Sequence, residues 1–582
     1  MARSVLPFDN DSGPGTMTMS ATSGRSPGRP QSPAPNPEMF TPKLVSTLRE
    51  GYSLQNFRSD AVAGLTVAIV ALPLSMAIAI GSGAKPENGL FTSIVGGFII
   101  SALGGSRFQI GGPAGAFIVL VATVVERFGM SGLFMATMMA GLLMLAVGYL
   151  KLGTYIKYIP HPVTVGFTAG IGVIIFAGEI KDLFGLSLDK EPGPLLPKLG
   201  ALWNSIGTVS PAAAGVSALC VAIILAMKHF LPRWPGLLIA VTTGGLVAWG
   251  LHLPIETIGS KFGGVPSMLP APAWPDFPFA RIPELIPSAI AIALLGSIES
   301  LLSAVVADGM TGRRHRSNCE LVAQGYANIA SALFGGVCAT GTIARTATNV
   351  RAGAHGPVAG MLHALVLLLF MMVAAPLAAY IPLAALAAVL ATVAWNMVEK
   401  HQITAILRHD CGEAAVFAAT FLLTIFRDLT EGIAVGVTLG SILFMHRMAQ
   451  LVEVRTHQKI LETDDGEENL IDTTSDVVTY RIAGPFFFGA ASAVSSVLEN
   501  IGQSPRAFIL DLSAVPLADA TGAQALMSFA AKARKAGAQV YIAAAEGNVQ
   551  SALLNAGLSR EDVTYVATVA EAQHKLEHQP SA

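Results

Sequence analysis

Residues 335 to 350, GGVCATGTIARTATNV, combine small side chains with a single arginine, Arg345. A membrane helix that starts at Gly341 would leave its first backbone N–H groups without partners, and these donors together with the helix dipole favour an anion. Thr340 and Thr342 would add hydroxyl donors, and the permanent charge of Arg345 would strengthen the positive field. Small residues also let membrane helices pack closely, but packing does not explain the arginine. The stretch therefore predicts an anion-binding site.

A second charged residue, Glu299, lies deep in the apolar run LLGSIESLLSAVV, residues 294 to 306. A carboxylate in the middle of a membrane costs roughly 2.5–3.5 kcal/mol and usually faces a cavity or a partner. Burial favours the neutral carboxyl group, whereas a nearby arginine favours the ionised one. Glu299 is therefore predicted to bind and release a proton that couples to anion transport. The alternative is a structural ion pair between Arg345 and either Glu299 or Asp308.

The elements that must hold these residues are membrane helices. Only 13% of the 582 residues are charged, whereas soluble domains have about a quarter. The runs at 61–80 and 360–379 are apolar and, as helices, long enough to cross about 30 Å of hydrocarbon. The composition predicts a polytopic α-helical membrane protein surrounded by lipid. The net charge of -2 gives no sign of a nucleic-acid partner, and the cysteines and histidines show no metal-binding spacing, so no metal or cofactor is expected.

Apolar segments recur from residue 60 to residue 449, and we count fourteen of them. They lie near 60–80, 88–104, 111–126, 131–150, 162–180, 211–231, 235–252, 284–307, 319–335, 341–352, 356–377, 380–396, 412–427 and 429–447. Lys and Arg concentrate in the connections on one side, such as RRHR at 313–316. The positive-inside rule then places both termini in the cytoplasm. This pattern predicts a multi-pass protein of the cell inner (plasma) membrane.

The chain also resembles itself. SALGGSRFQIGGPAG begins at Ser101 and SALFGGVCATGTIAR begins at Ser331, which aligns Gly111 with Gly341. The match falls on two unusually short segments, 111–126 and 341–352, and an odd number of spans in each half would invert the copies. Inverted repeats are typical of transporters in which two interrupted helices meet near the middle of the membrane.

Changes of composition divide the chain into four parts. Residues 1–45 are rich in Pro, Ser, Gly and Thr and are predicted to form a disordered cytoplasmic tail. Residues 46–450 are predicted to form the transmembrane domain, and 451–475 a charged linker. In 476–578, strand-like runs such as RAFILDLS alternate with amphipathic helical runs. This last part is therefore predicted to be a small cytoplasmic α/β domain with a mainly parallel sheet.

From about residue 45 to residue 575 the sequence resembles the sulfate permease (SulP) family, whose animal members are the SLC26 anion transporters. The resemblance rests on four motifs: ALPLSMAIAIGSGAKPENGLFTSIVGG, GSIESLLSAVVADGMTGRRHRSNCELVAQGYANIASALFGG, GTIARTATNVRAG and, in a C-terminal part similar to STAS domains, DLSAVPLADATGAQAL. It implies fourteen transmembrane segments in a seven-plus-seven inverted repeat, split into a core and a gate domain. It also implies an elevator-like movement of the core, an anion held between the N-termini of spans three and ten, and a homodimer.

By position, the residues that contact substrate in the family fall on spans one, three and ten of this chain: Leu74, Ile78, Ala114, Ile343, Ala344 and Arg345. Several members carry Ser before the span-ten arginine, where this chain has Ala344. A sodium-coupled bicarbonate branch carries Asp where this chain has Glu299, so the resemblance favours protons over sodium as the coupling ion.

The STAS-like part suggests a regulatory position. In related bacterial regulators the corresponding loop carries a phosphorylatable Ser or Thr before a glycine, and that position is Thr521 here. We expect Thr521 to cap the helix that begins near Gly522. Phosphorylation of Thr521 and a cytoplasmic partner at the STAS-like domain are the alternatives that the resemblance raises.

Together these features lead to one main hypothesis, proton-coupled uptake of a small inorganic anion, with sulfate as the first candidate. A bicarbonate or C4-dicarboxylate symporter of the same family is the first alternative. A membrane sensor that signals through the STAS-like domain and a nucleobase carrier are the others, although Arg345 favours an anion over a neutral base. No P-loop pattern is present, which argues against ATP-driven pumping, and nothing in the sequence indicates an enzyme.

Overall fold

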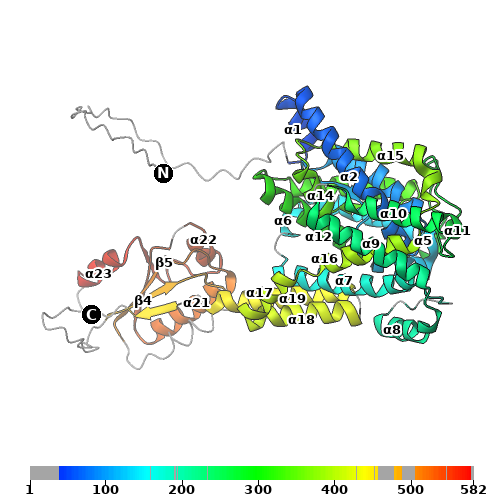
Figure 1. Cartoon of the computed structure of the whole chain (residues 1–582). Helices are drawn as coiled ribbons and strands as arrows, with labels where there is room; N and C mark the ends of the chain where they lie inside the picture. Colours follow the sequence, from blue (N-terminus) through cyan, green and yellow to red (C-terminus); the bar gives the residue numbers. More distant parts are fainter. Residues whose placement is uncertain are drawn as a thin grey trace, which may run out of the picture.

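The computed structural model describes residues 39–156, 159–188, 192, 194–231, 234–427, 429–450, 453–456, 477–487, 505–545 and 547–578. These residues form a large helical unit and a smaller α/β unit (Figure 1). The predicted tail lies outside the described residues up to residue 38, and its last residues begin the short helix α1, Lys43–Arg49. Most of the predicted linker, from 457 onward, also lies outside them.

The helical unit contains many helices that are long and apolar enough to cross a membrane. Within the described ranges, eight stretches meet that condition by length and composition: Leu54–Gly81, Gly115–Tyr149, His161–Phe184, Pro211–Phe230, Phe279–Thr311, Val358–Ala378, Leu383–His409 and Leu429–Gln450. Two shorter apolar helices accompany them, α10 (Gly236–Gly250) and α18 (Cys411–Phe426). A polytopic helical protein is therefore confirmed, and the count of fourteen spans stays a prediction.

Further helices complete the described part of this unit. The other helical elements are α2 Leu54–Gly81, α3 Pro86–Phe91, η1 Thr92–Gly96, α4 Gly97–Leu103, η2 Gly115–Phe117, α5 Ile118–Tyr149, α6 Gly153–Ile156, α7 His161–Phe184, α8 Leu195–Asn204, η3 Ile206–Thr208, α9 Pro211–Phe230, α11 Ile258–Phe262, η4 Phe279–Arg281, α12 Ile282–Thr311, α13 Ser317–Leu333, α14 Ile343–Arg351, α15 Val358–Ala378, α16 Leu383–Met397, α17 Lys400–His409 and α19 Leu429–Gln450. α5 consists of two helical stretches separated by a kink at Gly129, whose φ of 69° lies in the left-handed region. The kink lies between the segments predicted at 111–126 and 131–150.

Two short strands join the interrupted segments. β1 (Gly111–Gly112) pairs antiparallel with β2 (Thr340–Gly341), and Gly111 lies opposite Gly341. These are the two glycines that the internal repeat aligns, so equivalent residues of the repeat meet in space. A side chain does not fit here, because a Cβ on Gly341 would lie 1.6 Å from Nε2 of Gln109.

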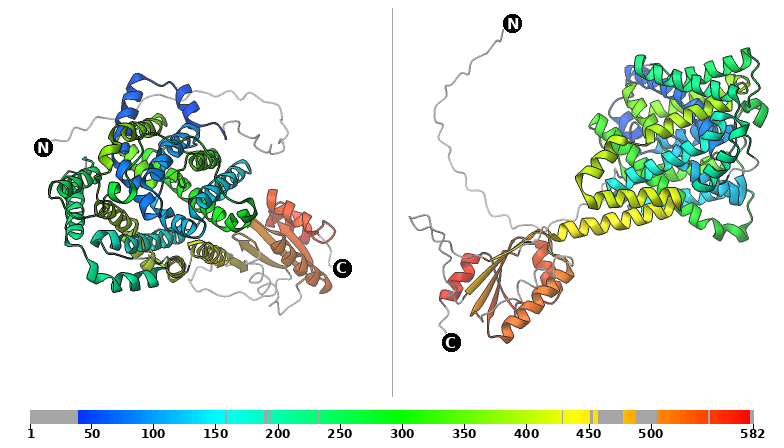
Figure 2. Two further views of the ribbon diagram at one scale, coloured as in Figure 1. Left: turned by 90° about the vertical axis from the view of Figure 1, so that its right-hand side faces the viewer. Right: turned by 60° about the horizontal axis from the view of Figure 1, so that its bottom comes forward.

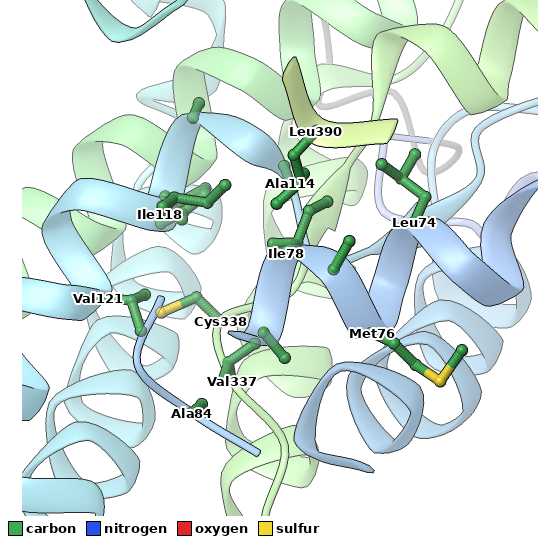
Figure 3. Close-up of a cluster of buried hydrophobic side chains, with 14 of the residues drawn as sticks. Leu74, Met76, Ile78, Ala84, Ala114, Ile118, Val121, Val337, Cys338 and Leu390 are labelled. Atoms are coloured by element: carbon green, nitrogen blue, oxygen red, sulfur yellow. The ribbon is translucent and has the colours of Figure 1, made fainter. Parts of the chain in front are cut away.

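Long helices pack around this strand crossing. α2 packs along α15, α13 packs along α5, and both α16 and α18 pack along α7. Their buried side chains form one apolar cluster, in which Leu74 and Ile78 of α2 lie near Ala114 and near Leu390 of α16 (Figure 3). The core of the helical unit therefore brings α2 beside the first interrupted segment.

The α/β unit contains a five-stranded sheet with the strand order β3-β4-β5-β6-β7. Its elements are β3 Glu453–Thr456, β4 Val477–Ala483, β5 Ala507–Ala514, α21 Ala520–Lys535, β6 Gln539–Ala543, α22 Gly547–Asn555, β7 Thr564–Val566 and α23 Val569–Glu577, and Figure 2 shows helices packed beside the sheet. β4 to β7 pair in parallel and β3 is antiparallel to β4, which confirms the mainly parallel sheet. β3 comes from the segment predicted as a linker, so the sheet starts earlier in the chain than residue 476.

Candidate functional site

The N-terminus of α14 has no side-chain cap. Its N-cap residue, Thr342, has an extended backbone, and its side chain does not cap the helix. The first N–H groups of a helix have no partner within it. Those of Ile343 and Ala344 belong to exposed residues, and Ile343 is 37% exposed. Uncapped donors at the positive end of a helix favour an anion.

The two threonine hydroxyls that were predicted to face the anion form hydrogen bonds inside the protein. Thr342 Oγ1 donates to the carbonyl oxygen of Ile110 at 3.3 Å. Thr340 Oγ1 donates to the carbonyl oxygen of Gly296 at 3.1 Å and lies 2.8 Å from Oγ of Ser300. Both hydroxyls therefore hold the turn between β2 and α14 in place, and the backbone N–H groups remain as the donors for a ligand.

The start of α5 lies beside the same crossing. Ala114, the N-cap of η2, has an extended backbone and no side chain that could cap the helix. In Figure 3 Ala114 lies between Ile78 and Leu390, with Leu74 on the neighbouring turn of α2. The structure therefore brings Leu74, Ile78 and Ala114 together as an apolar wall, and the β1–β2 pairing connects this wall to the start of α14.

Arg345 is 1% exposed. Its Nη2 donates to Oγ of Ser75 at 3.1 Å and to the carbonyl oxygen of Pro113 at 3.3 Å. Its Nη1 donates to Oγ of Ser93 at 3.2 Å. One side chain thus ties α14 to α2, to η1 and to the turn before η2. The guanidinium fits because residue 112 is a glycine, since a Cβ on Gly112 would lie 2.3 Å from Nη1.

The sequence left open a structural ion pair of Arg345 with Glu299 or Asp308. In the described part of the chain, no ion pair joins Arg345 to Glu299 or to Asp308. Asp308 instead lies 2.6 Å from Nδ1 of His315. Neutral acceptors surround the Arg345 guanidinium, so its charge is not cancelled by a bonded carboxylate and adds positive potential behind the helix starts.

Glu299 lies on α12 and is half-buried, and its Oε2 has no hydrogen-bond partner among the described residues. The next residue, Ser300, accepts a hydrogen bond from the N–H of Gly341 at 3.0 Å. One turn further, Ser303 donates to Oγ1 of Thr346 at 3.0 Å. α12 therefore supports β2 and α14 from one side and carries a carboxyl group beside them. A buried polar atom without a partner is uncommon and calls for a specific explanation.

Sequence reasoning missed the residues that hold Arg345. The hydroxyl oxygens of Ser75 and Ser93 lie 2.8 Å apart. Gly112 has no side chain and so leaves space for the guanidinium of Arg345. All three lie in motifs with many small residues, where a serine or glycine gives no periodic or charge signal. Their role is seen only in the structure, where they contact Arg345, which lies more than two hundred positions further along the chain.

Thr521 lies in the α/β unit. It is exposed and is the second residue of α21, whose N-cap is Asp519. The side chain of Asp519 accepts a hydrogen bond from the N–H of Gly522 at 2.8 Å. The expectation that Thr521 caps this helix is therefore wrong, because Asp519 already does so. Over the described ranges, no group of three or more His, Cys, Asp or Glu side chains is arranged to hold a metal ion.

Known proteins resemble the chain along most of its length. Residues 57–420 match the sulfate permease family and residues 470–572 match the STAS domain. The Bacillus subtilis (strain 168) protein named "Putative sulfate transporter YvdB" is 40% identical over 484 residues, which are 82% of this chain and 89% of that protein. "Bicarbonate transporter BicA" of Picosynechococcus sp. is 30% identical over 519 residues, which are 86% of this chain and 90% of that protein.

Solved structures agree with the fold. The murine Slc26a9 anion transporter in the inward-facing state has a TM-score of 0.83 at 18% identity, over 95% of this chain and 96% of that one. The transmembrane domain of a cyanobacterium bicarbonate transporter, BicA, has a TM-score of 0.60 at 32% identity, over 66% of this chain and 98% of that one. With the family match over more than half of its length, the chain belongs to the sulfate permease (SulP/SLC26) family of membrane anion transporters and carries a C-terminal STAS domain.

Proposed function

We propose that this family member is a secondary active transporter that takes up a small inorganic anion, with sulfate as the first candidate, and holds it between the starts of α5 and α14. The observation that carries the proposal is the meeting of two helix starts without side-chain caps at the β1–β2 crossing, with Arg345 buried behind them. The 40% identity to the relative named as a sulfate transporter supports sulfate.

The proposed site binds the anion mainly through backbone. The N–H groups of Ile343 and Ala344 donate to it, and hydrogen bonds to an ionised acceptor are the stronger kind. Leu74, Ile78 and Ala114 form the apolar wall that displaces water, which strengthens the field of the helix ends and of the guanidinium. Thr342 and Arg345 contribute through the position of α14 and through positive potential.

Glu299 is proposed to carry the coupling proton. An anion bound beside the carboxyl group disfavours its ionised form, since like charges repel in a medium of low dielectric constant. The anion and the proton therefore favour each other's binding, which is the electrostatic basis of symport. The unpartnered Oε2 of Glu299 supports this role, because a structural ion pair would have given it a partner.

We further propose fourteen spans in a seven-plus-seven inverted repeat, a core that moves against a gate like an elevator, and a homodimer. Both termini would lie on the cytoplasmic side of the inner (plasma) membrane. Domain boundaries would lie near residues 45 and 450, and the STAS domain would include β3 from Glu453. The pairing of Gly111 with Gly341 supports the repeat, because equivalent residues of an inverted pair meet at its axis.

Bicarbonate is the second candidate substrate. BicA, which is named as a bicarbonate transporter, is 30% identical over most of this chain. Backbone N–H groups and a helix dipole recognise negative charge more than the shape of an oxyanion, so the proposed contacts do not separate bicarbonate or a C4-dicarboxylate from sulfate. A role as a sensor that signals through the STAS domain, with Thr521 as a phosphorylation site, is the alternative without net transport.

Uptake into proteoliposomes tests the proposal. Radiolabelled sulfate, bicarbonate and fumarate are compared with and without an external acidic pH gradient, for the wild type and for Glu299→Gln. We expect one anion to accumulate with the gradient, and Glu299→Gln to bind that anion but to lose gradient-driven accumulation. Glu284→Gln is the matched control on the same helix, because Glu284 forms an exposed ion pair with Arg281 at 3.1 Å.

Two outcomes would contradict these assignments. If Glu299→Gln accumulates the anion with the gradient as the wild type does, the coupling proton binds elsewhere. If none of the three anions enters under any gradient, transport of a small oxyanion is refuted and the sensor alternative gains support.

A further inference from the structure

An apolar crevice of about 530 Å³ lies between α2 and α15 on one side and α10 on the other. Its walls include Pro73 and Met76 of α2, Thr242 of α10, and Met371 and Ala374 of α15. None of the described side chains that line it is charged, so it offers no binding group for the anion. It lies on a different face of α2 from the apolar wall described above.

We expect lipid hydrocarbon around this crevice, because the helices that form it are apolar. α2 and α15 are long apolar spans and α10 is a shorter apolar helix, and the rim residues Leu246 and Leu377 are both exposed. In a multi-pass membrane protein such surfaces face acyl chains. Trp249 and Tyr380 line one end of the crevice, at the last turn of α10 and just beyond α15. Trp and Tyr favour the membrane–water interface, so this end is where a lipid headgroup would lie.

The crevice adjoins the turn of α2 that carries two predicted substrate contacts. Leu72 and Met76 line the crevice, whereas Leu74 and Ile78 lie near Ala114 (Figure 3). Pro73 lies in the same turn and has no N–H, so this turn lacks one helix hydrogen bond. An occupant of the crevice would therefore support this turn from the face of α2 that points away from Ala114.

The crevice also separates helices with different partners. α2 packs along α15, whereas α10 packs mainly on α9, with further contacts to α16 and α2. A flexible hydrocarbon chain would fill the part of the boundary between α10 and α15 that their side chains leave open.

We propose that an acyl chain of a bilayer phospholipid occupies this crevice and supports the turn that carries Leu74 and Ile78. The effect on transport rests on the proposed function, but occupancy of the crevice does not. Lipid binding and transport are therefore measured separately, so that a failure of one proposal is distinguishable from a failure of the other.

The binding test uses phosphatidylcholine with a nitroxide near the end of one acyl chain, reconstituted with the full-length protein. Electron paramagnetic resonance reports the fraction of label that the protein immobilises. Ala374→Trp fills the crevice from α15 and should release one immobilised chain per protein molecule. Val373→Trp introduces the same indole one residue away, at a side chain that is 72% exposed and does not line the crevice, and should release none.

Thr242→Phe fills the crevice from α10 and provides a second variant if Ala374→Trp does not fold. It should give the same loss of immobilised label. Immobilised fractions equal to wild type in folded Ala374→Trp and Thr242→Phe would overturn the proposal. If the label is released and anion uptake stays at the wild-type rate, the chain binds there but does not support the α2 turn, and that part of the proposal is overturned.

Discussion

The buried guanidinium of Arg345 both holds α14 in position and adds positive potential. Arg345 satisfies Ser75, Ser93 and the carbonyl oxygen of Pro113, and a hydrogen bond to a charged group contributes about 1.5–3 kcal/mol. Burial of a charge without a bonded carboxylate is costly, and that cost falls when an anion binds in front of it. At the residue scale, the same contacts that hold α14 therefore also favour negative charge at the proposed site.

Arg345→Ala should weaken anion binding by at least about tenfold, which corresponds to about 1.4 kcal/mol. Arg345→Lys is the matched variant, because it keeps the charge but cannot reach several acceptors with a planar fork. We expect both variants to lower the unfolding temperature and Lys to retain the tighter binding. Isothermal titration of the purified variants with sulfate, or with the anion that the uptake assay identifies, measures this, and an unchanged Kd for Arg345→Ala would remove Arg345 from the site.

At the scale of single elements, each helix start is positioned by what packs behind it. α14 begins where β2 ends, and α12 holds that junction through Ser300 and Ser303. Outside the membrane spans, α1 is held at the edge of the helical unit in a similar way. The end of α1 is followed by Glu50, which accepts a hydrogen bond from Arg107 and lies 3.6 Å from Arg313.

The contact of Glu50 predicts a pH dependence. The hydrogen bond from Arg107 lowers the pKa of Glu50 below its usual value of 4.5. A lowered carboxyl pKa stabilises the folded protein above that usual value, and the contribution is lost as the pH falls through the lower folded value. Glu50→Gln should therefore lower the unfolding temperature slightly near neutral pH, because the carboxylate is half exposed.

Intrinsic fluorescence during heating measures the difference between wild type and Glu50→Gln across pH. The two proteins should unfold at the same temperature once the pH is below the folded pKa of Glu50. A difference that persists there would show that the substitution acts through packing and not through the charge.

The cap of α21 gives a second test at this scale. Asp519→Ala should destabilise the start of α21 by about 1 kcal/mol, because it removes the N-cap acceptor. Thr521→Ala should change stability by less than about 0.5 kcal/mol, because Thr521 is exposed and makes no cap. Hydrogen exchange of the α21 amides in the full-length protein distinguishes the two. Equal loss of protection in both variants would restore Thr521 as a structural residue.

At the scale of the whole molecule, the predicted anion contacts and the STAS sheet lie in different units. Every predicted contact with the anion lies between Leu74 and Arg345, and the sheet of the STAS domain begins at Glu453. The proposed binding site therefore lies in the helical unit, and the proposal leaves regulation or assembly to the STAS domain.

Removal of residues after Gln450 should leave the Kd for the anion within about twofold of the full-length value, a change of about 0.4 kcal/mol. The reason is that the residues proposed to bind the anion and to position α14 all precede that point. Titration of the truncated and full-length proteins in the same detergent compares them. Loss of binding in a truncated protein that is folded would show that the STAS domain shapes the site.

The sequence by itself determined the membrane helices, the α/β alternation and the repeat that aligns Gly111 with Gly341. These features are local or periodic, because a hydrocarbon crossing requires about 20 apolar residues and a parallel sheet requires strands separated by helices. The charged Glu299 was visible for the same reason, as a carboxyl group within an apolar run.

Only the tertiary structure decided how the polar groups are used. It showed that Arg345 is held by Ser75 and Ser93, that the Thr342 hydroxyl is occupied by Ile110, and that β3 joins the STAS sheet. Each of these outcomes depends on a partner distant in the chain. A local pattern records that a side chain can form a hydrogen bond, but the choice of partner is made by packing, which no local pattern contains.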